Sequence, residues 1–292
     1  SRGLGDVYKR QVEKIALITD SASDINSELI KKYNIHVLPF KIIFSDKEYK
    51  DGVDITPSML YEKLPTEIPT TSLPSISEFT ELLEKLKSDG YTHAIIITIS
   101  NCFSGTFNAA RLASESVSDI TTFVFDSLTL TMSEGAMVLE TATLIEEGKS
   151  FNEITNELPT IRKKIDVFFT LDTLTYLKKG GRIGKVAGTI AEALNIKPII
   201  TIKDDGFHTY SKVRGTKQSI SKLSNILNDY LAKGKCKVWI MNGDAPDKAD
   251  LLYNAIKNSD NLVECTLGGM IGPALGVNTG PGLVGFIVEM VD

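Results

Sequence analysis

Residues 92–108, THAIIITISNCFSGTFN, contain a strand, a sharp turn and the start of a helix. The first half, 92–99, is a nearly unbroken apolar run rich in β-branched residues, which is typical of a strand buried on both faces of a parallel sheet. Helical periodicity begins after the turn, so Ser104, Gly105 and Thr106 lie where the strand gives way to the helix. Ligands of open α/β sheets bind at this carboxyl edge, and we therefore look for a site here.

Ser104 allows two interpretations at this junction. A helix N-terminus offers unpaired N–H groups and partial positive charge, which suit a phosphate or a carboxylate. Serine is equally common as a helix cap, where its hydroxyl only satisfies the first turn. The local sequence leaves both interpretations open.

The composition limits the class of protein. A length of 292 residues predicts two domains, and a net charge of −5 argues against a general nucleic-acid binder. No apolar run approaches the ~20 residues that a membrane span needs. Residues 1–11, SRGLGDVYKRQ, are polar and basic without an apolar core, so they do not form a signal peptide. We expect them to be a disordered leader or an artificial scar.

The spacing of the cysteines and histidines does not indicate a metal site. Cys102, Cys236 and Cys265 are far apart without ligand-like spacing, which favours a reducing cytoplasm over a disulfide framework. The three histidines form no HxxxH or HxH pair, so no histidine-based metal site is expected. Cys102 lies beside the central turn, where a nucleophilic role competes with that of a buried thiol.

The first half of the chain alternates strands with helices. Strands are expected at 12–19, 35–44, 92–99 and 121–125, the second of them bent or at an edge because of Pro39. This alternation predicts a doubly wound α/β domain over 12–162. Asp20 follows the first strand as a turn cap or a catalytic carboxylate. Within 12–162 neither GxGxxG nor GxxxxGK[ST] occurs, so a dinucleotide or P-loop site in this domain lacks its main support.

Two loops of the sequence offer polar groups to a ligand. Residues 68–75, IPTTSLPS, hold two prolines and four hydroxyls, which predicts a fixed, extended loop rather than a regular element. Residues 178–185, KKGGRIGK, place four cations around three glycines ahead of a helix at 186–194. This second segment is a phosphate cradle, a partner-docking patch or a solvated turn, and Arg182 suits a bidentate oxyanion contact.

The second half has a different pattern. Strands at 196–200 and 207–213 form a predicted hairpin, so we expect an α+β domain with a mixed or antiparallel sheet over 163–292. Residues 268–282, GGMIGPALGVNTGPG, contain six glycines in a connection that can close tightly against a ligand. Asn278 and Thr279 are its only polar side chains.

Eight motifs occur together in the order of one known family. They are TDSASD (19–24), IPTTSLPS (68–75), SNCFSGTFNAA (100–110), FDSLTLTMSEG (125–135), YLKKGGRIGK (176–185), NIKPI (195–199), KVRG (212–215) and IGPALGVNTGPG (271–282). They cover nearly the whole chain after Gln11. By these motifs the chain resembles the DegV family, the fatty-acid-binding subunits of the bacterial fatty acid kinase system.

The resemblance implies a fatty acid between two domains, with its carboxylate in a polar cleft and its acyl chain in an apolar tunnel. The implied carboxylate-binding residues are Thr71, Ser104, Arg182 and Asn278, the last at a position where the family usually has histidine. Leu73 stands where the family often has glutamine. The implied supporting residues are Thr70, Ser72, Phe103, Gly105, Thr106, Thr279 and Gly280. No cofactor, metal or catalytic residue is implied.

The resemblance also implies partners. In the family a separate ATP-dependent kinase forms the acyl phosphate in the cytoplasm for phospholipid synthesis. Basic residues near the cleft would meet an acidic surface of that partner, and Arg214 and Lys185 are our candidates for docking. Nucleic acid is not a partner, and only transient contact with a membrane surface is compatible with the sequence. Two alternatives remain: a phosphoryl-transfer or hydrolytic enzyme that uses Asp20, Ser104 and Arg182, and a polyanion-binding module that uses KKGGRIGK.

Overall fold

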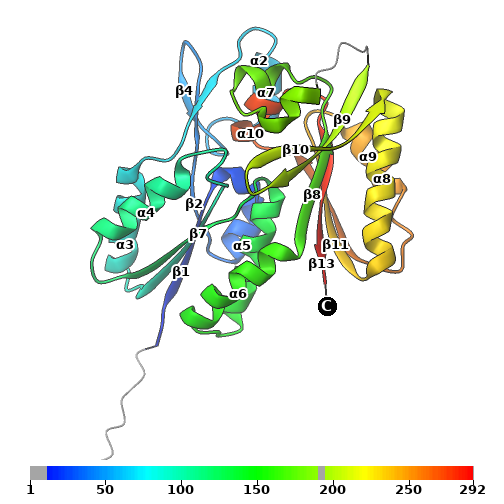
Figure 1. Cartoon of the computed structure of the whole chain (residues 1–292). Helices are drawn as coiled ribbons and strands as arrows, with labels where there is room; N and C mark the ends of the chain where they lie inside the picture. The colour runs from blue at the N-terminus through cyan, green and yellow to red at the C-terminus, as the bar shows by residue number, and fades with distance from the viewer. Residues whose placement is uncertain (1–11, 190–194, 292) are drawn as a thin grey trace, which may run out of the picture.

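The computed structural model describes residues 12–189 and 195–291, and it contains two large sheets of different type (Figure 1). The leader expected at 1–11 and the end of the helix expected at 186–194 lie outside the described residues. The first sheet is parallel, in the order β2-β1-β6-β7, and the second is mixed, in the order β10-β9-β8-β13-β11-β12. The expected combination of a parallel sheet and a mixed sheet is confirmed.

The parallel sheet is covered on both faces, as a doubly wound arrangement requires. Its strands are β1 (Ile15–Asp20), β2 (His36–Leu38), β6 (His93–Thr98) and β7 (Thr121–Asp126). Ile96 of β6 packs with apolar residues of α3 (Ile76–Ser88) and α4 (Thr106–Ser116), whereas Ile95 and Ile97 point to the opposite side, toward α5 (Met132–Glu146). The alternation in β6 therefore explains why all three isoleucines are fully buried.

Helix α5 joins the two sheets. It contacts β1 and β6 of the parallel sheet and β8 and β13 of the mixed sheet. A helix that is apolar nearly all round has to be buried on all sides, and residues 132–138 of α5 are all buried. One continuous apolar core thus runs from the first sheet to the second. The boundary expected at 162/163 coincides with the end of α6 (Phe151–Lys163) and stays a prediction.

The mixed sheet contains the expected hairpin. Its strands are β8 (Ile165–Thr170), β9 (Ile196–Lys203), β10 (Gly206–Arg214), β11 (Cys236–Asn242), β12 (Leu262–Met270) and β13 (Val284–Met290). Only β11 and β12 pair in parallel; the other neighbours are antiparallel. Helices α8 (Gly215–Lys233) and α9 (Pro246–Asn254) cover the outer face through a second apolar cluster.

A third, small sheet corrects two expectations. It has the order β4-β3-β5, formed by β3 (Lys41–Ile43), β4 (Glu48–Lys50) and β5 (Thr70–Ser72). The single strand expected at 35–44 is wrong, because the chain breaks after Leu38 and its two parts join different sheets. The irregular loop expected at 68–75 is also wrong. Its prolines flank the central residues without interrupting them, so Thr71 pairs with Ile42.

The glycine-rich segment 268–282 is also more regular than expected. It contains the helix α10 (Pro273–Thr279), which begins with a proline, a residue that is favourable at that position. Gly276 inside the helix is required by packing, since a Cβ there would lie 2.7 Å from Leu60 of α2 (Pro57–Lys63). The remaining short elements are η1 (Ser21–Ser23), α1 (Ser27–Lys32), α7 (Thr175–Lys179) and the 3-10 turn η2 (Gly184–Thr189).

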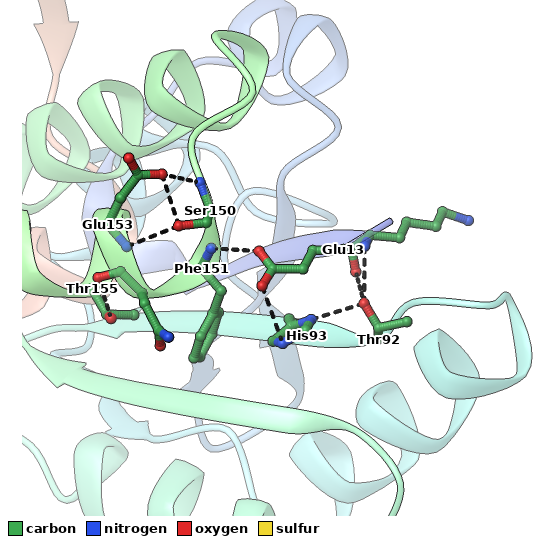
Figure 2. A network of polar contacts seen from close by, with 9 residues as sticks. Glu13, Thr92, His93, Ser150, Phe151, Glu153 and Thr155 are labelled. Carbon is green, nitrogen blue, oxygen red and sulfur yellow. Dashed lines mark hydrogen bonds and ion pairs between the residues drawn. The ribbon is translucent and has the colours of Figure 1, made fainter. Parts of the chain in front are cut away.

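The amino edge of the parallel sheet is closed by a polar network (Figure 2). The Glu13 carboxylate accepts a hydrogen bond from the backbone N–H of Phe151 at 2.7 Å, at the start of α6. Ser150 and Glu153 add a capping box at the same helix end. Thr92 Oγ1 accepts the N–H of Lys14 at 2.9 Å. These contacts give the polar residues at this edge a structural role.

Candidate ligand-binding site

A cavity of about 250 Å³ lies at the opposite, carboxyl edge of the parallel sheet and is lined by both halves of the chain. Its walls are mainly apolar. They include Ile99, Phe103 and Leu130 from the first half and Phe169, Phe207 and Met241 from the second. The rings of Phe103 and Phe207 lie 4.4 Å apart, so this aromatic pair joins the halves over the cavity.

Four polar residues singled out from the sequence line this cavity together: Thr71, Ser104, Arg182 and Asn278. They come from four different elements: β5, the turn before α4, the turn after α7, and α10. Of the expected supporting residues, Ser72, Phe103, Gly105 and Thr279 also line it. Thr70 lines a neighbouring cavity instead, Thr106 is buried beneath Ser104, and Gly280 packs against Tyr176.

A second cavity, of about 500 Å³, adjoins the first and is far more polar. Its lining includes Thr66, Glu67, Thr70 and Lys179. The two cavities share Thr71, Arg182 and Asn278. These three side chains therefore stand at the boundary between an apolar space and a polar one, which is where an amphipathic ligand places its headgroup.

The interpretation of Ser104 as the helix cap is not supported. The N-cap residue of α4 is Gly105, without a side-chain capping bond. Ser104 Oγ instead lies 2.8 Å from Thr106 Oγ1, and the N–H of Thr106 approaches it only to 3.4 Å. The Ser104 hydroxyl is half-buried at the cavity wall, so it has remaining hydrogen-bonding capacity for a ligand.

Arg182 reaches from the second half of the chain toward the first. Its Nε donates to the carbonyl of Phe103 at 3.4 Å, and its Nη1 donates to the carbonyl of Gly180. A Cβ at Gly180 would collide with the amide of Asn278. The glycine thus lets α10 approach the KKGGRIGK turn closely, as expected for glycines beside a ligand-facing arginine.

Asp20 is separated from the other members of the alternative catalytic set. It is fully buried and does not line the cavity. Its carboxyl accepts backbone hydrogen bonds from Ala22 at 3.0 Å and Ile99 at 2.9 Å, which is the expected structural role. Burial raises the pKa of Asp20 to about 7. Cys102 is exposed, so the interpretation as a buried thiol is wrong. Partial desolvation of its thiol raises the pKa, which disfavours the thiolate that a nucleophile would need.

Sequence reasoning missed a group of enclosed carboxyls beside the cavity: Asp24, Asp51 and Glu134, next to Asp20. Burial raises the pKa of Asp24 to about 7 and that of Asp51 to about 6, and the pKa of Glu134 is raised as well. The only sequence signal was the density of acids and hydroxyls in TDSASD. Within 12–189 and 195–291, no group of three or more potential ligands can hold a metal ion.

Over the same described residues, no helix is both long enough and apolar enough to cross a bilayer.

Comparison with known sequences identifies one family. The family described as "Uncharacterised protein, DegV family" matches residues 14–290. A DegV domain-containing protein of Clostridium acetobutylicum is 47% identical over 278 residues, which cover 95% of this chain and 99% of the relative. A second such protein, from Clostridium perfringens, is 46% identical over 279 residues, with 95% and 99% coverage.

Comparison with solved structures gives the same family. A fatty-acid-binding DegV family protein of Thermus thermophilus superposes with a TM-score of 0.89 at 28% identity, covering 95% of this chain and all of that one. DegV of Bacillus subtilis, described as a fatty acid binding protein, gives 0.87 at 27% identity, with 96% and 100% coverage. A stearic-acid-binding protein of Eubacterium ventriosum gives 0.82 at 28% identity, with 95% and 98% coverage.

Proposed function

This chain belongs to the DegV family, and on that premise we propose that it is a carrier that binds one long-chain fatty acid. The acyl chain would occupy the apolar cavity, and the carboxylate would lie at the boundary with the polar cavity. The observation that carries the proposal is the sharing of Thr71, Arg182 and Asn278 by the two cavities.

The energetics support a tight complex without chemistry. Burying about fourteen CH₂ groups at ~0.8 kcal/mol each contributes roughly 11 kcal/mol before the costs of ordering the ligand. A buried carboxylate without partners would oppose binding, so the headgroup needs donors. Carrier function requires nothing further from the protein, which fits our proposal that the chain itself is not an enzyme.

We assign the donors as follows. The hydroxyls of Thr71 and Ser104 and the amide of Asn278 each donate one hydrogen bond to the carboxylate. Arg182 supplies the positive charge from the solvent side of the site, where its guanidinium is exposed. Thr70, Ser72, Phe103, Gly105, Thr106, Thr279 and Gly280 would support this set.

The bound acid would be presented to a separate ATP-dependent fatty acid kinase in the cytoplasm, whose acyl phosphate product would enter phospholipid synthesis. Arg214 is our docking residue of choice. It is exposed at the N-terminus of α8, where a positive charge is unfavourable to the helix dipole. A contribution to helix stability therefore does not explain an arginine at this position. Lys185 is the second, although it is paired with Asp205 at 2.5 Å and would have to exchange that partner.

Mass spectrometry of the purified protein, native and after organic extraction, tests the carrier. We expect one fatty acid per chain, and the released species identifies the preferred acyl chain. The carrier is excluded if no lipid is found and added fatty acid neither binds nor raises the melting temperature. Turnover of ATP or an ester without a second protein, lost in Ser104→Ala, would favour the enzyme instead.

Arg214→Glu tests the partner separately. We expect acyl phosphate formation with the kinase to fall while fatty acid binding stays unchanged. Lys217→Glu, one turn along the same helix, is the matched control for a general effect of charge. A joint loss of binding and coupling in Arg214→Glu would make this residue structural.

A further inference from the structure

Two enclosed carboxyls outside the cavity hold one of its walls. Asp24 Oδ1 accepts the backbone N–H of Gly272 at 2.9 Å, and Asp51 Oδ2 accepts that of Ala274 at 3.3 Å. Pro273 between them has no N–H, so these two bonds engage the backbone donors available at the start of α10. We call Asp24 and Asp51 the carboxyl latch.

Helix α10 is the element that this latch positions. The helix brings Leu275, Asn278 and Thr279 to the cavity, whereas neither Asp24 nor Asp51 lines it. The latch residues belong to the first half of the chain and α10 to the second. The latch is therefore a direct tie between the halves at the wall that would carry part of the headgroup site.

The same latch holds a second wall. Thr131 donates its hydroxyl to Asp24 Oδ2 at 2.6 Å, and Thr131 lines the cavity at the N-terminus of α5. Its φ of 54° is rare for a β-branched residue and has to be maintained by surrounding contacts. Asp51 is fixed in turn by the hydroxyl of Ser21 at 2.7 Å.

The sequence of α10 is adapted to this arrangement. A Cβ at Gly272 would lie 2.7 Å from Asp24 Oδ1 and 3.5 Å from Asp51 Oδ1. The backbone of Gly272 has φ of −65°, which any residue can adopt, so the requirement for glycine there comes from the close Asp24 carboxyl and not from the turn.

We propose that Asp24 and Asp51 are positioning residues for ligand retention: they hold the start of α10 and thereby keep the cavity closed around the acyl chain. The inference rests on the proposed carrier function. It assigns the latch a role in how fast the ligand leaves, although the latch does not contact the ligand.

The test measures the release of cis-parinaric acid, a fluorescent C18 fatty acid, from the full chain by stopped flow. Asp24→Ala and Asp51→Ala remove the acceptors, and Gly272→Ala displaces the Asp24 carboxyl without removing charge. Loss of one such hydrogen bond, at ~1.4 kcal/mol, corresponds to about tenfold faster release. Glu289→Ala is the matched control, because it removes a carboxyl that is 5% exposed on β13 and belongs to another contact.

Asp24→Asn separates latching from general stability. Its amide oxygen can still accept from Gly272, and its amide nitrogen can donate to the hydroxyl of Thr131. We therefore expect Asp24→Asn to release at the wild-type rate, with fast release only in the alanine and Gly272→Ala variants.

The inference is overturned if folded Asp24→Ala, Asp51→Ala or Gly272→Ala protein, shown by cooperative melting, releases the probe at the wild-type rate. Equal release from Asp24→Asn and Asp24→Ala also overturns it. If the wild-type chain binds neither cis-parinaric acid nor any other added long-chain fatty acid and retains no lipid, the carrier proposal itself fails, and that result is distinct from the other two.

Discussion

The two edges of the parallel sheet use acidic side chains in opposite ways. At the amino edge, Glu13 binds the first N–H of α6 while about a third of its side chain stays in contact with solvent. At the carboxyl edge, Asp20 and Asp24 make similar bonds to backbone N–H groups, but Asp20 is fully buried and Asp24 is partly buried, and burial raises the pKa of each to about 7. An exposed carboxylate can thus accept such a bond at little cost in free energy. Burying a carboxyl for the same bond costs more, so these acids indicate that the backbone segments they bind must be held in a precise position.

The largest effect expected from this contrast is a dependence of stability on pH. The pKa values of Asp20 and Asp24 are higher in the folded chain than the ordinary value of 3.8, so the folded state binds more protons between about pH 4 and 7. Stability is therefore greatest at low pH within that window and falls as the pH rises through 7. We expect about 3 kcal/mol less unfolding free energy at pH 8 than at pH 5.

Urea unfolding at the two pH values measures this difference. Asp24→Asn should reduce it, because the amide carries no charge to bury. A flat or rising profile between pH 5 and 8 would mean that these carboxyls are not the dominant titrating groups.

The second largest effect is expected on the affinity for a fatty acid, and it again distinguishes the carboxyl edge of the parallel sheet from the amino edge. Thr71→Val removes one hydroxyl from the carboxyl-edge cavity, and a hydrogen bond to a charged group contributes about 1.5–3 kcal/mol. We expect affinity for a long-chain fatty acid to fall by roughly 10- to 100-fold, measured by calorimetry. Thr155→Val, in the amino-edge network of Figure 2, is the matched control and should leave affinity unchanged. Equal affinities for the two variants would remove Thr71 from the site.

A smaller effect should follow from adding charge at Asn278. Asn278→His places a group with an ordinary pKa near 6.5 at the proposed carboxylate site, so its protonated form adds one attractive charge. Affinity should rise a few-fold between pH 8 and pH 5.5 relative to the wild type. Parallel titrations of the two proteins give the comparison, and a variant with the wild-type profile would place this side chain away from the carboxylate.

The smallest effect is expected at the amino edge. Glu13→Ala removes the acceptor for the N–H of Phe151, and losing a helix cap typically costs about 1 kcal/mol. Thermal unfolding should show this modest loss, with fatty acid affinity unchanged. A change in affinity would mean that the two edges are coupled through the sheet.

Much of the fold follows from the local pattern. The apolar run before Ser104 and the hairpin at 196–213 depend on periodicity and turn residues, which the sequence displays directly. Thr70–Ser72 was missed as a strand because its pairing with β3 is decided by a partner segment and not by its own prolines. Helix α10 was missed because Gly276 inside it serves the packing against Leu60 and Tyr61, which only the folded chain brings near.

The residues of the candidate site likewise divide into those that were predicted from the sequence and those that were not. Thr71, Ser104, Arg182 and Asn278 were named from a resemblance between motifs, and the fold brings them to one cavity. The carboxyl latch could not be anticipated, because the bond from Gly272 to Asp24 joins residues 248 positions apart. Nothing in the spacing of TDSASD distinguishes an acid that caps its own turn from one that holds a distant helix.

The burial of α5 between the two sheets has a consequence for how a ligand can enter. A hinge that parted the sheets would expose apolar surface of α5 to water on at least one side, at ~25 cal/mol for each Å² uncovered. Displacement of the seven-residue helix α10, whose start the carboxyl latch holds, would leave α5 and both sheets in place. The motion that costs least is therefore a local displacement of one wall of the cavity, while the two sheets and α5 keep their positions during each exchange.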